Sequence, residues 1–409
     1  MNDRPAARLL SVEEARARVL AGLAAIGVEI VGLSEAAGRV LAGPVAARLT
    51  QPTADVSAMD GYALRASDAA AGARLRVVGA APAGRPFDGV LKWGEAVRLF
   101  TGSVIPAGAD SVLLQEDAAT DGEIVVVRAA PCSGQHIRRQ GQDFAAGDVV
   151  LEAGRRLGAR DLGLAAAANH PFLAVHRRPR VAILSTGDEI SLPGEPVVPG
   201  GIVSSNAHCL AAMVRAMGGE AVILPVAADD AGAIAQAASG ASGMNLLVTT
   251  GGASVGDHDL VQAGLAEQGF ALDFWKIAMR PGKPMIFGRL GAMPVLGLPG
   301  NPVSAFVCAV LFMLPMLARL CGVAGEVLPA ARARLGAAVR ANDHRADHLR
   351  ALLSCDSAGG LVATPFERQD SAMLRVLASA DALILRAPHD PAAGVGDEVS
   401  VLRLDTLGL

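Results

Sequence analysis

The stretch NLLVTTGGASVGDHD, residues 245–259, decides the fold class. It begins with a largely apolar run, which is typical of a parallel strand buried on both faces. Gly251 and Gly252 then let the backbone approach a ligand without interference from a Cβ atom. Asp257 and Asp259 follow on either side of a histidine. Because ligands of open α/β sheets bind outside the carboxyl ends of the strands, we expect this loop to line a binding crevice.

Further apolar runs and helical stretches alternate in the same part of the chain, residues 178–328. This alternation predicts a doubly wound α/β sheet. The runs are VAILS (181–185), AVILPV (221–226) and PVLGL (294–298), and the helical stretches are AHCLAAMVRAMG (207–218) and AGAIAQAAS (231–239).

The rest of the chain has a different character. Short Val/Leu runs between Gly, Pro and Asp turns predict a β-rich insert over 50–146 and a small all-β module over 329–409. Residues 11–25 are typical of an amphipathic helix with a serine N-cap. The Ala-rich segment 147–177 follows the insert, and we predict that it packs with residues 1–49 as one discontinuous domain.

The composition argues against two classes of partner. Hydrophobic residues make up 52% of the chain but aromatic residues only 3%, so the cores must consist of Ala, Val and Leu. The net charge is −4 without a basic stripe, which argues against nucleic acid. The uncharged run 302–318 is the best candidate for a membrane span, but it is shorter than the roughly 20 residues that a span needs and contains Pro315. We therefore predict a buried helix and no membrane contact.

The N-terminal residues and the cysteines indicate a cytoplasmic protein. Residues 1–20 contain acids and arginines where a signal peptide would be apolar. The five cysteines include no CxxC pair, which favours reduced thiols over disulfides or a zinc site.

Four acids that follow predicted strands, Glu189, Asp229, Asp257 and Asp259, are expected at one edge of the sheet. Asp259 is preferred over Asp257, which could serve only as a helix-start residue. Gathered carboxylates repel one another unless a cation lies between them, and Mg²⁺ prefers oxygen ligands and phosphate. These acids therefore predict a Mg²⁺ site. Helix capping is the competing interpretation for any single acid, including Asp230. His258 has no second histidine beside it, so we do not assign it to a metal.

Candidate anion-binding residues lie near the same edge. Lys276, Arg280 and Lys283 surround a Pro-Gly turn and suit a phosphate or another oxyanion. A solvated turn is the competing interpretation, and it fits Arg280 best. Asn301 and Pro302 begin a helix directly after a strand, where free N–H groups favour an anion, although a plain capped helix is an equal alternative.

The sequence lacks the Gly-x-Gly-x-x-Gly and Walker A motifs. The residues alone therefore predict an α/β protein with a crevice for a metal and an anion, acting on a phosphorylated ligand. Asp60 and Thr101, in the β-rich insert, look like ordinary turn residues.

Seven segments together resemble the molybdopterin molybdenumtransferases, the MoeA family, to which the E domain of gephyrin is related. Each segment alone is weak evidence for the family, but all seven in the same order are highly specific for it. They are SAMDGYA (57–63), FTGSVIPAGADSVLLQED (100–117), RRQGQDFAAGD (138–148), RVAILSTGDEI (180–190), TTGGASVGDHD (249–259), KIAMRPGKPMIFG (276–288) and GLPGNPVSAF (297–306).

The resemblance implies a multidomain α/β protein. It has an elongated N-terminal domain, the β-rich insert, a doubly wound α/β molybdopterin-binding domain and a C-terminal β-barrel. It also implies a homodimer whose cleft combines the insert of one chain with the α/β and C-terminal domains of the other. Molybdopterin adenylyltransferase and molybdoenzyme-maturation proteins are the implied partners.

The implied reaction inserts molybdenum from molybdate into adenylylated molybdopterin, with Mg²⁺-assisted release of AMP. The glycines Gly251 and Gly252 and the helix start at Asn301 would hold the pterin phosphate. By resemblance, the catalytic positions are Asp60, Thr101, Asp143, Glu189, Asp229, Asp259 and Lys276, and those near molybdate are Ser254, Arg280, Lys283, Pro284, Arg350 and Ser371.

Five positions depart from the family pattern. Val56 replaces a usual Asn, Gln142 a usual Glu and Arg280 a common Lys, and residues 202–206 read IVSSN where Ile-Arg-Asp-Ser-Asn is typical. Arg keeps the charge of Lys but not its geometry. Two alternatives remain at this point: a molybdopterin-binding scaffold without catalysis, and the adenylyltransferase reaction.

Overall fold

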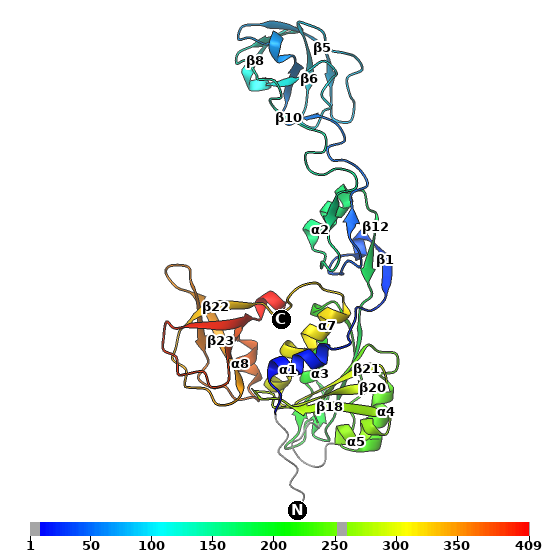
Figure 1. Cartoon of the computed structure of the whole chain (residues 1–409), viewed down its shortest axis with the longest axis vertical. Helices are drawn as coiled ribbons and strands as arrows, with labels where there is room; N and C mark the ends of the chain where they lie inside the picture. The colour runs from blue at the N-terminus through cyan, green and yellow to red at the C-terminus, as the bar shows by residue number, and fades with distance from the viewer. Residues whose placement is uncertain (1–8, 252–259, 409) are drawn as a thin grey trace, which may run out of the picture. The chain divides into compact units, whose positions relative to one another are not determined.

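The computed structural model describes residues 9–251 and 260–408 and divides into two compact units (Figure 1). One unit comprises Met1–Glu29, Gly38–Ala42 and Val175–Leu409, and the other comprises Ile30–Ala37 and Gly43–Ala174.

The first unit is built on a six-stranded sheet in the order β16-β13-β17-β21-β20-β18. The first four strands are parallel, and β20 and β18 add antiparallel partners at one side. The sheet confirms the four predicted strands, but only β13, β17 and β21 are buried as predicted, because β16 lies at the edge of the sheet and none of its residues is buried. The bounds are β13 Arg180–Ser185, β16 Glu220–Ile223, β17 Leu246–Thr250, β18 Phe270–Lys276, β20 Pro284–Leu290 and β21 Met293–Leu298.

Helices cover both faces of this sheet, as the doubly wound prediction requires. In β13, Val181 and Ile183 belong to one core cluster, whereas Ala182 and Leu184 belong to another. The first cluster takes in α1 (Val12–Leu20), α3 (Asn206–Ala216) and the helix Pro302–Leu320, and the second takes in α4 (Ala231–Ser239) and α5 (Leu260–Ala266).

The helix Pro302–Leu320 is apolar enough to cross a membrane, but 94% of its apolar window is buried inside the protein. It consists of α6 (Pro302–Cys308), a π-helical turn (Ala309–Met313) and α7 (Leu314–Leu320). The π turn lies just before Pro315, which lacks an N–H donor and crowds the preceding turn. The prediction of a buried core helix is therefore confirmed.

The C-terminal strands close into a five-stranded barrel, because β23 pairs with both β24 and β25. Half of its buried interior residues are alanines, in line with the low aromatic content. The barrel strands are β22 Ala330–Leu335, β23 Ala346–Cys355, β24 Leu361–Pro365, β25 Ala382–Arg386 and β26 Glu398–Arg403; β19 (Met279–Arg280) pairs with β23, and α8 spans Leu374–Ala378.

The second unit contains the predicted β-rich insert, a curled six-stranded sheet in the order β7-β4-β6-β5-β9-β8. Its strands are β4 Gly61–Leu64, β5 Arg74–Ala81, β6 Glu95–Leu99, β7 Ser111–Leu114, β8 Ala118–Asp121 and β9 Ile124–Val127. Short two-stranded pairs lie outside the large sheets: β1 Val28–Gly32 with β12 Phe172–His176, β2 Val45–Ala46 with β11 Val149–Leu151, β3 Val56–Ser57 with β10 Ile137–Arg138, and β14 Ile190–Ser191 with β15 Ile202–Val203.

The N-terminal helix α1 begins with the predicted cap, a reciprocal capping box between Ser11 and Glu14. Its buried face, with Val12, Ala15 and Val19, packs into the core of the six-stranded α/β sheet. The second helix, α2 (Ala159–Ala167), lies in the other unit. The domain boundaries drawn from the sequence stay predictions. All five cysteines are free thiols, as expected.

Candidate active site

A cavity of 600 Å³ lies at the carboxyl edge of the six-stranded sheet. Three strand ends open into it: Ser185 ends β13, Thr250 ends β17, and Gly300 follows β21. Two of the predicted ligand-binding residues, Gly251 and Asn301, line it together with Glu189. The strand-end loops that the sequence singled out therefore share one crevice, as the rule for open α/β sheets predicts.

Asn206, the first residue of α3, ties two of these strand ends together. Its side-chain amide nitrogen donates to Thr250 Oγ1 at 2.8 Å and to the carbonyl oxygen of Gly300 at 2.8 Å. The Thr250 hydroxyl in turn lies 3.4 Å from the carbonyl oxygen of Pro299. Since Thr250 is buried, these bonds fix the floor of the crevice. Sequence reasoning missed Asn206 as a positioning residue, although its place after the unusual segment 202–205 was visible.

The backbone at Gly251 is held in a conformation that suits only glycine. Its φ is +98°, and a Cβ atom would lie under 3.0 Å from the carbonyl oxygen of Thr186 on the neighbouring loop. The glycine is thus needed for close packing of two loops, and the role predicted for it toward a ligand stays a prediction. Gly252, Ser254 and Asp259, with Asp257 and His258, lie outside the described residues.

Glu189 and Asp229, two of the three acids predicted for Mg²⁺, are exposed carboxylates on adjacent loops. The loops run side by side, because the Gly187 N–H donates to the Ala227 carbonyl at 3.1 Å. Asp188 Oδ1 also accepts the Asp229 N–H at 3.1 Å. No three His, Cys, Asp or Glu side chains gather as a metal site within residues 9–251 and 260–408. The third predicted ligand, Asp259, lies outside them, so the Mg²⁺ set stays a prediction.

Lys276, Lys283 and Pro284 lie at this same edge of the sheet. Antiparallel pairing places Lys276, at the end of β18, opposite Pro284, at the start of β20. The Lys276 ammonium lies 3.9 Å from the centroid of the Trp275 ring, a cation–π contact. Neither lysine forms an ion pair with the residues that the structure describes. Neither ammonium group is therefore bound to a carboxylate of this part of the chain, which leaves both available to an anionic ligand.

The start of α6 is already partly engaged by the barrel. Asn301 takes the N-cap position and Pro302 the first helical position, as predicted, but the Asn301 side chain makes no capping hydrogen bond. Instead the Val303 N–H donates to the Ser371 carbonyl oxygen at 3.0 Å. One of the N–H groups expected to bind an anion thus holds the loop that carries Ser371.

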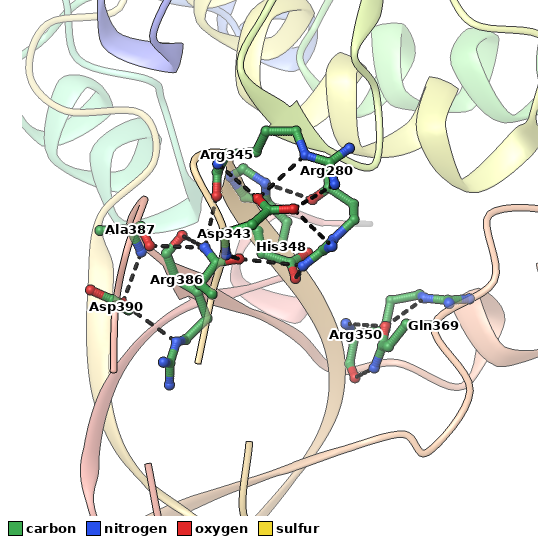
Figure 2. A network of polar contacts seen from close by, with 11 residues as sticks. Arg280, Asp343, Arg345, His348, Arg350, Gln369, Arg386, Ala387 and Asp390 are labelled. Carbon is green, nitrogen blue, oxygen red and sulfur yellow. Dashed lines mark hydrogen bonds and ion pairs between the residues drawn. The ribbon is translucent and has the colours of Figure 1, made fainter. Parts of the chain in front are cut away.

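Arg350, on β23, anchors the same loop (Figure 2). Only 1% of it is exposed, and its guanidinium donates to the main-chain carbonyl oxygens of Arg368, Asp370 and Met373 at 3.0–3.3 Å. Gln369 completes the arrangement, since its Oε1 accepts from the Arg350 N–H at 3.0 Å and its Nε2 donates to the Arg350 carbonyl at 2.9 Å. Burial lowers the pKa of Arg350. Arg350 and Ser371 therefore belong to one hydrogen-bonded loop.

In the insert, Asp60 and Thr101 are brought together although 41 residues separate them. Asp60 Oδ1 accepts from the Thr101 N–H at 2.7 Å and from its hydroxyl at 2.8 Å. These bonds, with the nearby Arg98 cation, lower the pKa of Asp60 below its usual value. Asp143, by contrast, makes no side-chain hydrogen bond or ion pair to the described part of the chain, and its N–H donates to the Gln51 carbonyl.

We expect Thr101→Val to raise the pKa of Asp60 toward its ordinary value, because the variant loses the hydroxyl that donates to the carboxylate. Carboxyl-detected NMR titration measures the shift. Thr101→Ser is the control, since it keeps the hydroxyl and should keep the low pKa. An unchanged Asp60 titration in Thr101→Val would show that the hydroxyl contributes nothing.

Comparison with known proteins decides the family. The model described as "MoeA N-terminal region (domain I and II)" matches residues 10–169, "Probable molybdopterin binding domain" matches 182–319 and "MoeA C-terminal region (domain IV)" matches 332–404. Molybdopterin molybdenumtransferase 2 of Mycobacterium tuberculosis is 38% identical over 375 residues, covering 88% of this chain and 91% of the relative. This chain belongs to the molybdopterin molybdenumtransferase family.

Other members agree with this assignment. The molybdopterin molybdenumtransferase of Nostoc is 39% identical over 305 residues, 72% of this chain and 70% of the relative. Among solved structures, a molybdopterin biosynthesis MoeA protein of Pyrococcus horikoshii superposes with a TM-score of 0.82 at 29% identity, covering 97% of this chain and 99% of that one. The predicted multidomain α/β architecture of the family is thereby confirmed.

Arg280, which the sequence analysis identified as a departure from the family pattern, is bonded to other side chains (Figure 2). Its guanidinium binds the buried carboxylate of Asp347 through Nε, at 3.1 Å, and through Nη2. Asp347 lies opposite Arg280 in the pairing of β19 with β23. Two other departures have local contacts only. Gln142 accepts a hydrogen bond from the Arg139 N–H, and Val56 lies in β3.

Beside this network lies His348, which is buried, and burial lowers its pKa from 6.5 to about 4. Asp347 and Glu13 oppose the shift and Arg16 adds to it, while Nδ1 lies 3.4 Å from the Arg280 carbonyl oxygen. In unfolded chains the histidine takes up a proton near pH 6.5, whereas the folded protein resists protonation down to about pH 4. Stability that is complete above pH 6.5 is therefore lost as pH falls toward 4.

We expect the free energy of unfolding to drop by about 2 kcal/mol between pH 7.5 and 5 because of His348 alone. Trp275 fluorescence in a Trp93→Phe background reports on this unit, because the chain has only two tryptophans. His348→Gln is the control, since it cannot titrate, and the difference between the two pH profiles isolates the histidine. Parallel profiles would contradict the shift.

Proposed function

We propose that this protein inserts molybdenum from molybdate into adenylylated molybdopterin and releases AMP in a Mg²⁺-dependent reaction. The observation that carries the proposal is the match of three family models in order along residues 10–404. The names of the curated relatives state the transferase activity for those proteins. The cavity at the carboxyl edge of the sheet, with Lys276 and Lys283 at that same edge, supplies a site of suitable chemistry.

The chain's own residues have distinct tasks in this proposal. The backbone at Gly251 and the start of α6 bind the substrate phosphate, with Asn206 holding the strand ends in place. Lys276 and Lys283 attract molybdate, which is itself an oxyanion. The Asp60–Thr101 pair orients the substrate from the insert.

The carboxylates Glu189 and Asp229, with Asp259, would hold Mg²⁺. The two described acids offer hard oxygen donors on adjacent loops and have no ion-pair partner in the described part of the chain, which fits such an ion. Bound there, Mg²⁺ would stabilise negative charge on the phosphoryl oxygens.

The direct test supplies the pure protein with adenylylated molybdopterin, molybdate and Mg²⁺, and measures AMP and metal-loaded cofactor. We expect one AMP for each molybdenum inserted. Absence of AMP release would reject the reaction, and capture of a partner protein without turnover would favour a scaffold. Adenylylation of molybdopterin from ATP would point to the adenylyltransferase reaction instead. Full turnover by Asp259→Ala would reject the role assigned to that acid.

We further propose that the enzyme is a cytoplasmic homodimer whose sites take residues from both chains, which accounts for functional positions as distant as Asp60 and Asp229. Mixing two inactive variants tests this. Asp60→Ala mixed with Asp229→Ala should regain activity, because a mixed dimer has one intact site. No recovery after subunit exchange would show that each site is made by one chain. Molybdopterin adenylyltransferase and molybdoenzyme-maturation proteins are the proposed partners.

A further inference from the structure

The Arg280 guanidinium is largely engaged by acceptors of the protein itself, although its side chain is 45% exposed. Besides its bonds to Asp347, its Nη2 lies 3.3 Å from Asn342 Oδ1 and its Nη1 lies 3.5 Å from Asp343 Oδ2. All three guanidinium nitrogens thus contact an acceptor, and two carboxylates offset the charge. The hydrogen bond and charge of Asp347 accordingly raise the pKa of Arg280. Arg345 shares Asp343 and closes the network (Figure 2).

The loop that carries Arg280 connects two sheets. It leaves the α/β sheet at Lys276, pairs with the barrel as β19 and returns to the α/β sheet at Pro284. The Ala346 N–H donates to the Ala278 carbonyl at 2.8 Å on the barrel side. The Arg280–Asp347 pair therefore fastens the middle of this loop to β23, while Lys276 and Lys283 lie at its two ends.

A buried carboxylate needs a partner, which explains why Arg280 is held so firmly. Asp347 is only 8% exposed, and Arg280 supplies it with two donors from a rigid fork. Lysine at position 280 would keep the charge but supply a single flexible ammonium. The departure from Lys to Arg thus suits an ion pair with Asp347 more than it suits a freely mobile cation at a ligand.

We propose that Arg280 and Asp347 are positioning residues that fix the 276–284 loop, and that the oxyanion is bound by the lysines at its ends. The inference rests on the proposed molybdenum insertion for the meaning of the loop. It changes the role of Arg280 from a molybdate ligand to a tether between the α/β sheet and the barrel.

Steady-state turnover of adenylylated molybdopterin at varied molybdate concentration distinguishes a positioning role of Arg280 from direct binding of molybdate. The variants are Arg280→Gln, Arg280→Lys, Asp347→Asn and the Arg280→Gln/Asp347→Asn double variant. As tether residues, each single variant should lower kcat about tenfold with KM for molybdate within about threefold of wild type. The kcat of the double variant should be no lower than that of the less active single variant, because either single substitution already removes the Arg280–Asp347 contact.

The opposite pattern would overturn the proposal. If Arg280 binds molybdate, Arg280→Gln raises KM for molybdate tenfold or more, while Arg280→Lys stays near wild type. Asp347→Asn would then leave the KM for molybdate unchanged or lower it, because Arg280 would be released from its carboxylate partner. Arg332→Gln is the matched control, since it removes an exposed ion pair with Glu398 on the same barrel and should change neither constant.

Hydrogen exchange tests the tether without any turnover, so failure of the proposed function would remain distinguishable. In Asp347→Asn and Arg280→Lys, amides of peptide 276–284 should exchange at least tenfold faster than in wild type, and Arg332→Gln should leave them unchanged. Unaltered exchange in folded Arg280→Lys would overturn the proposal whatever the enzyme's activity. Inactive wild-type protein with the expected exchange pattern would reject the molybdenum-insertion reaction alone.

Discussion

Replacing Gly251 with alanine is expected to lower the free energy of unfolding by about 3 kcal/mol and to abolish turnover. Two costs add up. The positive φ of +98° is unfavourable for alanine by about 1–2 kcal/mol, and the new methyl group collides with the Thr186 carbonyl oxygen. Because that oxygen belongs to the backbone of the neighbouring strand-end loop, the clash cannot be relieved by turning a side chain. The two loops must separate, and the crevice opens with them.

Gly300→Ala provides a matched control in the same cavity. Its Cβ atom would lie 3.6 Å from the Gly251 Cα, which is an ordinary contact, and its φ is not positive. We therefore expect wild-type stability in this variant. Denaturant unfolding followed by Trp275 fluorescence in the Trp93→Phe background measures both variants, and AMP release measures turnover. A loss below 1 kcal/mol in Gly251→Ala would show that the loops adapt and that the packing is looser than its geometry indicates.

The parallel core was predictable from the sequence because burial on both faces leaves a clear signal. Continuous apolar runs, each with a glycine or small residue where the chain leaves the sheet, correctly predicted β13, β17 and β21 and hence the edge that carries the crevice. The N-cap of α1 was equally predictable, because Ser11 and Glu14 have the spacing of a capping box.

Contacts between residues that are distant in the sequence were not predictable. Nothing local distinguishes Asp60 and Thr101 from other turn residues, since their hydrogen bonds join loops 41 residues apart. The roles of Asn206 and Asp347 could not be predicted for the same reason, because each bonds a residue that is distant in the sequence and near only in the folded chain. The resemblance to the family supplied Arg350 and Ser371 without showing that the arginine holds the loop of the serine.

Replacing Arg350 with methionine is expected to cost about 4 kcal/mol and to reduce turnover at least about a hundredfold. Methionine matches the length of the side chain but leaves the carbonyl oxygens of Arg368, Asp370 and Met373 without the donors that Arg350 supplies. The loop they belong to also caps α6 through the Ser371 carbonyl. Loss of the arginine therefore weakens the barrel and displaces Ser371 from the start of α6 in one step.

Arg350→Lys should not restore either property, because a single ammonium cannot reach three carbonyl oxygens on different sides of a planar fork. This separates a geometric role from a charge role, since a site that needs only a cation would tolerate lysine. Arg375→Met, at an exposed position of α8 in the same module, is the control and should behave like wild type. Near-normal unfolding and turnover in Arg350→Lys would mean that the loop is held by Gln369 and the backbone of β23, with Arg350 serving mainly as a positive charge.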